Sequence, residues 1–192
     1  TALEAGADYA TQSTHKVLSA FSQSSMIHVN DPDFNEHLFR ENFNMHTSTS
    51  PQYSMIASLD VARKQIVLEG YKLLSRTLDL AKELRDQINA TGVFQVLELS
   101  DLLPDEIRQD GIQLDPTKVT VDISRCGLTV EELIQELFER FNIQVEKSTF
   151  NTLTLLLTIG TTRSKVSRLY DALMRIAREN RAPRRIYQSA EI

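Results

Sequence analysis

The stretch KVTVDI, residues 118–123, alternates apolar and polar side chains as a half-buried β-strand does. A capping box follows at Thr129 and Glu132, and it predicts the start of a helix whose apolar side chains recur at three- and four-residue steps. Residues 143–147 and 152–159 predict two adjacent strands, and the pattern of a final helix follows them. Strand, helix, two strands and helix in this order predict a small α+β layer, with the helices on one face of a short sheet.

Upstream of this layer the pattern is that of one long helix. From about Ser58 to Ala90 apolar residues recur at helical spacing, and the glycine at position 92 ends the pattern. Residues 93–99 predict a further strand. Proline, glycine and several acidic residues cluster after this strand, which favours a boundary there. We therefore predict two domains, residues 1–100 and residues 101–192.

The first 57 residues are polar and show little periodicity. A short apolar run at residues 26–29 predicts a strand, and Pro51 favours the start of a helix. A polar stretch of this length inside a folded domain is typical of a segment that lines a site.

The composition indicates an ordinary soluble globular chain of 192 residues, with 41% hydrophobic and 24% charged residues. No apolar run approaches the roughly 20 residues of a membrane span, and the N-terminus lacks the pattern of a secretory signal. The net charge of −5 argues against a general nucleic-acid binder. Five arginines near the C-terminus are therefore predicted to be solvated: Arg175, Arg178, Arg181, Arg184 and Arg185. The single cysteine, Cys126, fits a reducing compartment, so we expect a cytoplasmic protein without a membrane or nucleic-acid partner.

Few residues are arranged for chemistry. No histidine has a second ligand at a zinc-like spacing, and glycine-rich phosphate motifs and the serine-hydrolase elbow are absent, so no metal site is predicted. Two polar segments remain, QSTHK at residues 12–16 and HTSTSP at residues 46–51. Lys16 is the only lysine among the first 60 residues; a positioned lysine amine is a useful nucleophile, and clustered hydroxyls suit a phosphate. From these residues alone, a solvated lysine and an ordinary turn remain the alternatives.

Several motifs together resemble the bacterial ornithine/lysine/arginine decarboxylases, which are pyridoxal-phosphate enzymes of the aspartate-aminotransferase fold. TQSTHK at residues 11–16 resembles the cofactor-lysine segment of that family. Further matches follow in the family's order: AFSQ (20–23), SMIHV (25–29), FNE (34–36), HTSTSPQY (46–53), ASLDVA (57–62), LDPTKVT (114–120), IQVEK (143–147) and LTIG (157–160).

The resemblance implies a role for each matching residue. Lys16 and His15 would be the catalytic residues, with Lys16 carrying the cofactor as a Schiff base. Ser13 and His15 would lie at the cofactor phosphate and beside the imine. Ser48 would bind the phosphate of the partner subunit's cofactor, since this family builds its site across a dimer. The acidic loop that contains Asp110 lies where the family places a carboxylate that recognises the basic substrate, and a solvated loop is the alternative there.

The implied fold class is α/β to α+β: the second half of an aspartate-aminotransferase-like (fold type I) domain that binds pyridoxal 5'-phosphate, then a small α+β C-terminal domain. The family carries a receiver-like wing and the first half of the cofactor domain before the lysine. We therefore expect a C-terminal portion that needs the missing N-terminal portion and is inactive by itself.

The implied reaction is the decarboxylation of lysine, arginine or ornithine, which releases carbon dioxide and a polyamine-type amine. The expected assembly is a homodimer or larger homo-oligomer with a shared site. The alternatives are a non-catalytic dimerisation or regulatory fragment, and an aminotransferase or lyase of the same fold.

Overall fold

The long helix α3 (Tyr53–Ala90) contributes residues to both of the compact units into which the chain divides, residues 1–72 and residues 73–192. The computed structural model describes residues 2–108 and 110–180, so the predictions for Arg181, Arg184 and Arg185 lie outside the described residues. The domain boundary predicted near residue 100 falls inside the second unit and stays a prediction. None of the helices in the described ranges is long and apolar enough to span a bilayer.

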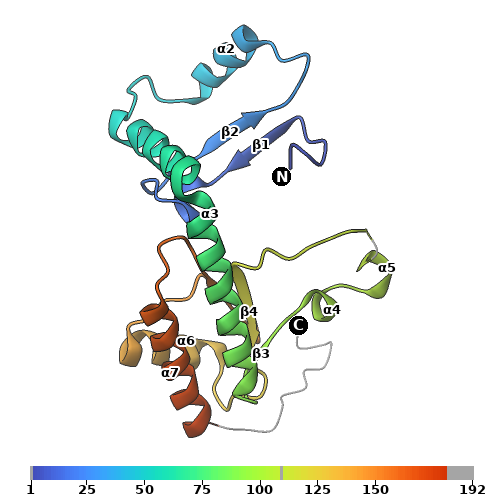
Figure 1. Cartoon of the computed structure of the whole chain (residues 1–192), viewed down its shortest axis with the longest axis vertical. Coiled ribbons are helices and arrows are strands. Elements are labelled where there is room, and N and C mark those ends of the chain that lie inside the picture. The colour runs from blue at the N-terminus through green and yellow to red at the C-terminus, as the bar shows by residue number, and fades with distance from the viewer. Residues whose placement is uncertain (1, 109, 181–192) are drawn as a thin grey trace. The chain divides into compact units, whose positions relative to one another are not determined.

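The second unit is built on a four-stranded antiparallel sheet, in the order β3 (Gln95–Val96), β4 (Lys118–Asp122), β6 (Thr152–Leu156) and β5 (Lys147–Ser148). Val119 lies opposite Leu155 and Val121 opposite Leu153, and these four side chains are buried. Because side chains alternate along a strand, they share one face. They join a hydrophobic core with residues of α3, α6 (Val130–Phe141) and α7 (Arg163–Glu179), which Figure 1 shows beside the sheet. The predicted α+β layer is confirmed.

A polar side chain sets the start of α6, and backbone geometry sets its end. The hydroxyl of Thr129 accepts from the N–H of Glu132, whose carboxylate accepts from the N–H of Thr129, so the predicted capping box is confirmed. Asn142 ends α6 in the left-handed conformation, with φ 53°. The guanidinium of Arg140, at the end of α6, donates to both carboxylate oxygens of Glu179 on α7, at 2.8 and 3.1 Å, and lowers the pKa of Glu179.

Some predicted strands are wrong in extent. Most of residues 143–147 is not a strand, because the N–H of Ile143 is used to close α6 on the carbonyl of Leu137, at 2.9 Å. The strand predicted over residues 93–99 shortens to β3, since Glu98 and Asp101 form a capping box that starts α4 (Leu99–Leu102). A second short helix, α5 (Asp105–Arg108), follows.

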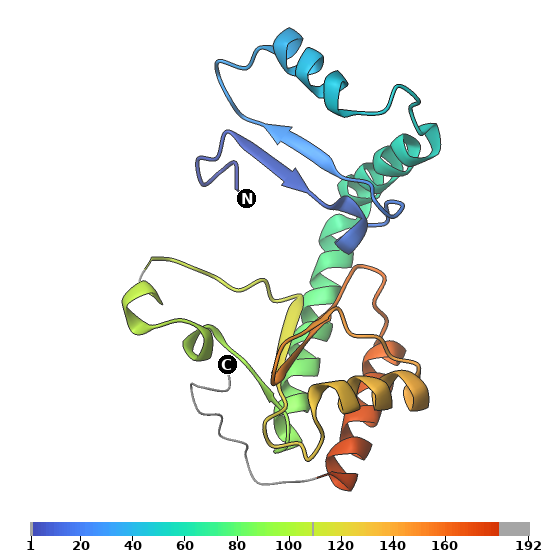
Figure 2. The same ribbon diagram turned by 180° about the vertical axis from the view of Figure 1, so that it is seen from behind.

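The first unit contains an antiparallel hairpin of β1 (Tyr9–Gln12) and β2 (Met26–Val29), which Figure 2 shows from behind. The strand predicted at residues 26–29 is confirmed. The turn of helix α1 (Thr14–Val17) follows β1, and α2 (Glu36–His46) follows β2 with its N-terminus capped by Asn35. No residue of α2 is buried.

Candidate active site

Lys16 lies on α1, directly after the end of β1. Thr14 anchors this turn: it is buried, its hydroxyl donates to the carbonyl of Gln12 at 3.4 Å, and its carbonyl accepts from the N–H of Leu18 at 3.1 Å. The N–H of Lys16 donates to the carbonyl of Ser13 at 3.1 Å. The turn therefore places Thr14 inward, while the side chains of Ser13 and Lys16 are exposed.

His15 is held by the loop that leads into β2. Its backbone N–H donates to the carbonyl of Ser24 at 3.3 Å, and its ring Nδ1 lies 2.9 Å from the same oxygen. A carbonyl oxygen only accepts, so Nδ1 carries the proton in this contact. In the neutral ring Nε2 is then left as an acceptor. The sequence motifs quoted above flank Ser24 without including it, and a backbone carbonyl leaves no signal in a sequence.

Ser24 is itself buried, and its hydroxyl makes no hydrogen bond among the described residues. A buried hydroxyl without a hydrogen-bond partner costs free energy unless another polar group bonds to it. It adjoins the segment of His15 and Lys16 because its carbonyl is bonded to His15. The loop is also fixed three residues before Ser24, at Phe21. The hydroxyl of Ser58 on α3 accepts from the N–H of Phe21 at 3.1 Å and donates to the carbonyl of Met55 at 2.7 Å.

Ser48 lies in a separate segment of the first unit, between α2 and α3, and is exposed. Its hydroxyl accepts from the N–H of Ser50 at 3.1 Å, which is a local turn. Over the ranges that the structure describes, no hydrogen bond joins Ser48 to His15 or Ser24. The structure thus groups Ser13, His15 and Lys16 with Ser24, and leaves Ser48 outside this group.

Asp110 belongs to the second unit and is exposed; its N–H donates to the carbonyl of Ile107 at 3.3 Å. Asp101, nine residues earlier, is part of the α4 capping box, where its carboxylate accepts from the N–H of Glu98 at 2.8 Å. In the described ranges, no three His, Cys, Asp or Glu side chains come together as metal ligands would.

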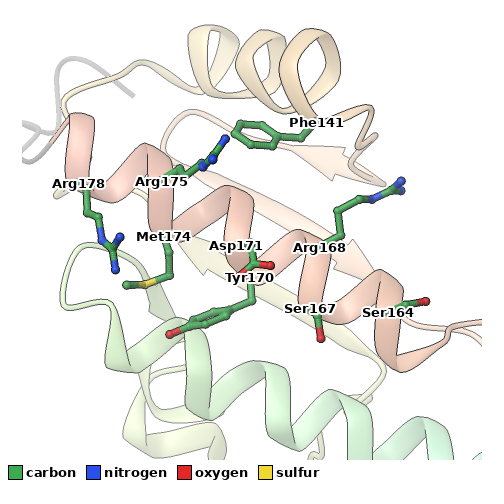
Figure 3. A pocket seen from close by; sticks show the side chains of 9 residues that line it. All are labelled: Phe141, Ser164, Ser167, Arg168, Tyr170, Asp171, Met174, Arg175 and Arg178. Carbon is green, nitrogen blue, oxygen red and sulfur yellow. The ribbon is translucent and has the colours of Figure 1, made fainter.

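A hollow of about 840 Å³ lies along α7, and none of the predicted site residues lines it. Figure 3 shows Arg175 pointing toward Phe141 of α6, whereas Tyr170, Met174 and Arg178 leave the helix on its other side. The lining side chains thus spread around one helix and do not converge on a common point.

Comparison with known proteins places this geometry in context. Residues 2–165 match the model of the family described as "Orn/Lys/Arg decarboxylase, major domain". The chain is 33% identical over 193 residues to an arginine decarboxylase of Bacillus subtilis, a match that covers 100% of this chain and 38% of that protein. It is 33% identical over 213 residues to the lysine decarboxylase LdcA of Pseudomonas aeruginosa, with 88% of this chain and 28% of that protein covered.

The crystal structure of the Francisella novicida lysine decarboxylase LdcF is similar with a TM-score of 0.73 at 30% identity, over 88% of this chain and 28% of that one. A NifS-like protein, with a TM-score of 0.65 at 16% identity over 91% of this chain and 47% of that one, shares the fold. The predicted fold class is confirmed by these neighbours. The chain thus spans 28–38% of the length of the decarboxylases that it matches, and 47% of the NifS-like protein.

Proposed function

The chain belongs to the Orn/Lys/Arg decarboxylase family, and from this premise we propose that it carries the cofactor lysine of a pyridoxal-phosphate-dependent decarboxylase of basic amino acids. The reaction would convert lysine, arginine or ornithine to carbon dioxide and an amine. The observation that carries the proposal is the arrangement around α1. There an exposed Lys16 follows a histidine whose ring is held by the carbonyl of Ser24.

The residues of α1 and its loop fit the cofactor. The orphaned hydroxyl of Ser24 is a buried polar atom beside the lysine segment, and Ser13 exposes a second hydroxyl there. Lys16 would hold the cofactor through its amine, with Ser13 at the phosphate and His15 beside the ring. When bound, pyridoxal phosphate supplies an electron-accepting ring that makes loss of the substrate carboxylate feasible.

The chain's own residues would orient the reacting groups. The contact with Ser24 fixes the ring plane of His15 and leaves its Nε2 as an acceptor toward the site. The buried Thr14 fixes the turn from which Lys16 projects, so the amine is presented by a short, anchored helix. Preorganisation of this kind lowers the entropic part of the barrier.

The substrate and partner assignments extend the same proposal. A basic substrate requires a carboxylate, and we assign Asp110, which is exposed on the segment after α5. We also propose a homodimer in which Ser48 of one subunit binds the phosphate of the cofactor held by the other. A cytoplasmic location is part of the proposal and is supported by the single, buried Cys126.

The test is Lys16→Ala in the full-length protein, with Lys82→Ala as the matched control because Lys82 is an exposed lysine of the second unit. We expect release of carbon dioxide from lysine, arginine and ornithine to fall about 10³-fold or more in Lys16→Ala. Borohydride reduction with pyridoxal phosphate should then yield no adduct on the peptide of residues 11–20. Retained activity, or an adduct on another lysine, would overturn the assignment. A keto acid as the main product of the unsubstituted protein would instead indicate an aminotransferase.

A further inference from the structure

Residues 21–24 form a tight turn between α1 and β2. The N–H of Ser24 donates to the carbonyl of Phe21 at 3.1 Å, and this hydrogen bond closes the turn. The third residue of the turn, Gln23, has a φ of 73°, in the left-handed region that favours glycine. A residue with a side chain adopts this region at a cost in free energy, so the surrounding structure must hold the turn in place.

Both ends of this turn are anchored. At its start, the N–H of Phe21 donates to the hydroxyl of Ser58 on α3 at 3.1 Å. At its end, the carbonyl of Ser24 accepts from the backbone N–H of His15 at 3.3 Å and lies 2.9 Å from the ring Nδ1 of the same residue. The turn therefore connects a side chain of α3 to the ring of the histidine that precedes Lys16.

Ser58 is suited to anchor the turn because it is buried and both sides of its hydroxyl are used. The side chain is 8% exposed. Its hydroxyl donates its single proton to the carbonyl of Met55 at 2.7 Å, so its oxygen meets the N–H of Phe21 as an acceptor. Met55 lies on the same helix, three residues earlier, and this bond fixes the direction of the hydroxyl. The position of Phe21 is therefore set by α3.

We propose that Ser58 is a positioning residue for the decarboxylation: through the turn of residues 21–24 it sets the orientation of the His15 ring. This role rests on the proposed function, because it concerns the histidine beside the cofactor lysine. The link runs through the carbonyl of Ser24 and not through its hydroxyl. A substitution at Ser58, rather than at Ser24, therefore tests the orientation of the ring.

The first experiment measures whether Ser58 holds the turn, by hydrogen exchange and mass spectrometry on the full-length protein without cofactor. In Ser58→Ala we expect the amides of residues 20–25 to exchange about tenfold faster, because the N–H of Phe21 loses its acceptor. Ser54→Ala is the matched control, since Ser54 is an exposed serine one turn earlier on α3 and gains the same helix propensity. Unchanged exchange in Ser58→Ala, or equal acceleration in both variants, would overturn the proposal.

A second pair of variants isolates the hydroxyl from the volume of the side chain. Ser58→Thr and Ser58→Val have the same shape, but only threonine keeps a hydroxyl, which in a helix can bond the carbonyl of an earlier turn as Ser58 does. We expect the amides of residues 20–25 to exchange faster in Ser58→Val than in Ser58→Thr. Equal exchange rates in these two variants would overturn the proposal even if Ser58→Ala fails to fold.

The closing experiment asks whether the effect passes through His15, with kcat measured for Ser58→Ala, His15→Ala and the double variant of the full-length protein. We expect Ser58→Ala to lower kcat about tenfold by itself, and by less than about twofold when His15 is also replaced, because no ring remains to be oriented. A residue that only stabilises the fold would lower kcat by the same factor in both backgrounds.

That result would overturn the role of Ser58. It would leave the proposed function standing, provided that Lys16→Ala abolishes activity. A full-length protein that releases no carbon dioxide would instead overturn the proposed function and this role together.

Discussion

The backbone turn that carries Lys16 is positioned by the two residues that precede it, Thr14 and His15. Thr14 is buried and bonds back to Gln12, and His15 is bonded twice to the carbonyl of Ser24. All three of these contacts end on backbone carbonyls, and a backbone carbonyl is present at every position of a chain. A substitution at Ser24 therefore changes the hydroxyl but not the carbonyl that orients His15.

A second pair of residues closes the hairpin that carries this segment. The hydroxyl of Tyr9 donates to Oδ2 of Asp31 at 2.7 Å, which raises the pKa of Tyr9 and lowers the pKa of Asp31. The hydrogen bond with Tyr9 is the larger cause for Asp31, and the backbone N–H of Asp33 adds to it.

We predict that Tyr9→Phe raises the pKa of Asp31 toward that of an ordinary carboxyl group. Because the folded pKa of Asp31 is lowered, its contribution to stability is present above the unfolded pKa and is lost as the pH falls through the folded pKa. Loss of stability on acidification should therefore be smaller in Tyr9→Phe. An NMR titration of ¹³C-labelled aspartate measures the shift. Tyr170→Phe is the control and should leave the titration of Asp31 unchanged; an unchanged titration in Tyr9→Phe would contradict the role of this bond.

At the scale of single elements, α6 is started by a reciprocal pair of hydrogen bonds. The hydroxyl of Thr129 and the carboxylate of Glu132 each satisfy a backbone N–H that the helix leaves unpaired. We predict that Thr129→Ala lowers the free energy of unfolding of the second unit by about 1 kcal/mol. Thr129→Ser keeps the hydroxyl and should lose only a small part of that amount. Urea denaturation followed by circular dichroism measures both, and equal losses in the two variants would show that the cap is not the cause.

The same reasoning shows which elements a sequence predicts. The helices α6 and α7 and the strands β4 and β6 were predicted because their apolar residues recur at a period that burial against a core imposes. The helix α2 was missed because none of its residues is buried, and the hairpin strand β1 was missed because it lacks the short apolar run that predicted β2. Residues 143–147 were predicted as a strand. Ile143 and Val145 do pack against the core, but the backbone of Ile143 is committed to the end of α6.

At the scale of the whole molecule, the candidate site draws on segments far apart in the sequence. Ser13, His15 and Lys16 lie together because they belong to one short motif, with Ser13 as the N-cap of α1 and the other two on that turn. The contributions of Ser24 and Ser58 depend on the loop that returns to α3, and the fold alone creates that proximity. Asp110, which we propose as the carboxylate for the basic substrate, lies in the other unit, and no local sequence pattern predicts it.

The two units also differ in how much apolar surface they bury, and this difference has a measurable consequence. The continuous hydrophobic core belongs to the second unit, whereas over residues 2–72 the buried residues are Ala62, Gly70 and three polar residues. Local stability follows buried apolar contacts. In hydrogen exchange followed by mass spectrometry, we therefore expect the amides of β4, β6 and α7 to exchange slowest, and those of α2 to exchange fastest among the helices of eight or more residues.

Leu173→Ala sharpens this test, because Leu173 is fully buried on α7. Removing its side chain should cost about 2–5 kcal/mol and accelerate exchange across β4, β6 and α6 together, since these elements share one core. The hairpin of β1 and β2 should keep its exchange rates, because none of its residues belongs to that core. Leu38→Ala, at an exposed leucine of α2, is the matched control and should alter neither region. If amide exchange in the hairpin accelerates to the same degree as in β4, the two units unfold together. The boundary within α3 would then not separate two regions of different stability.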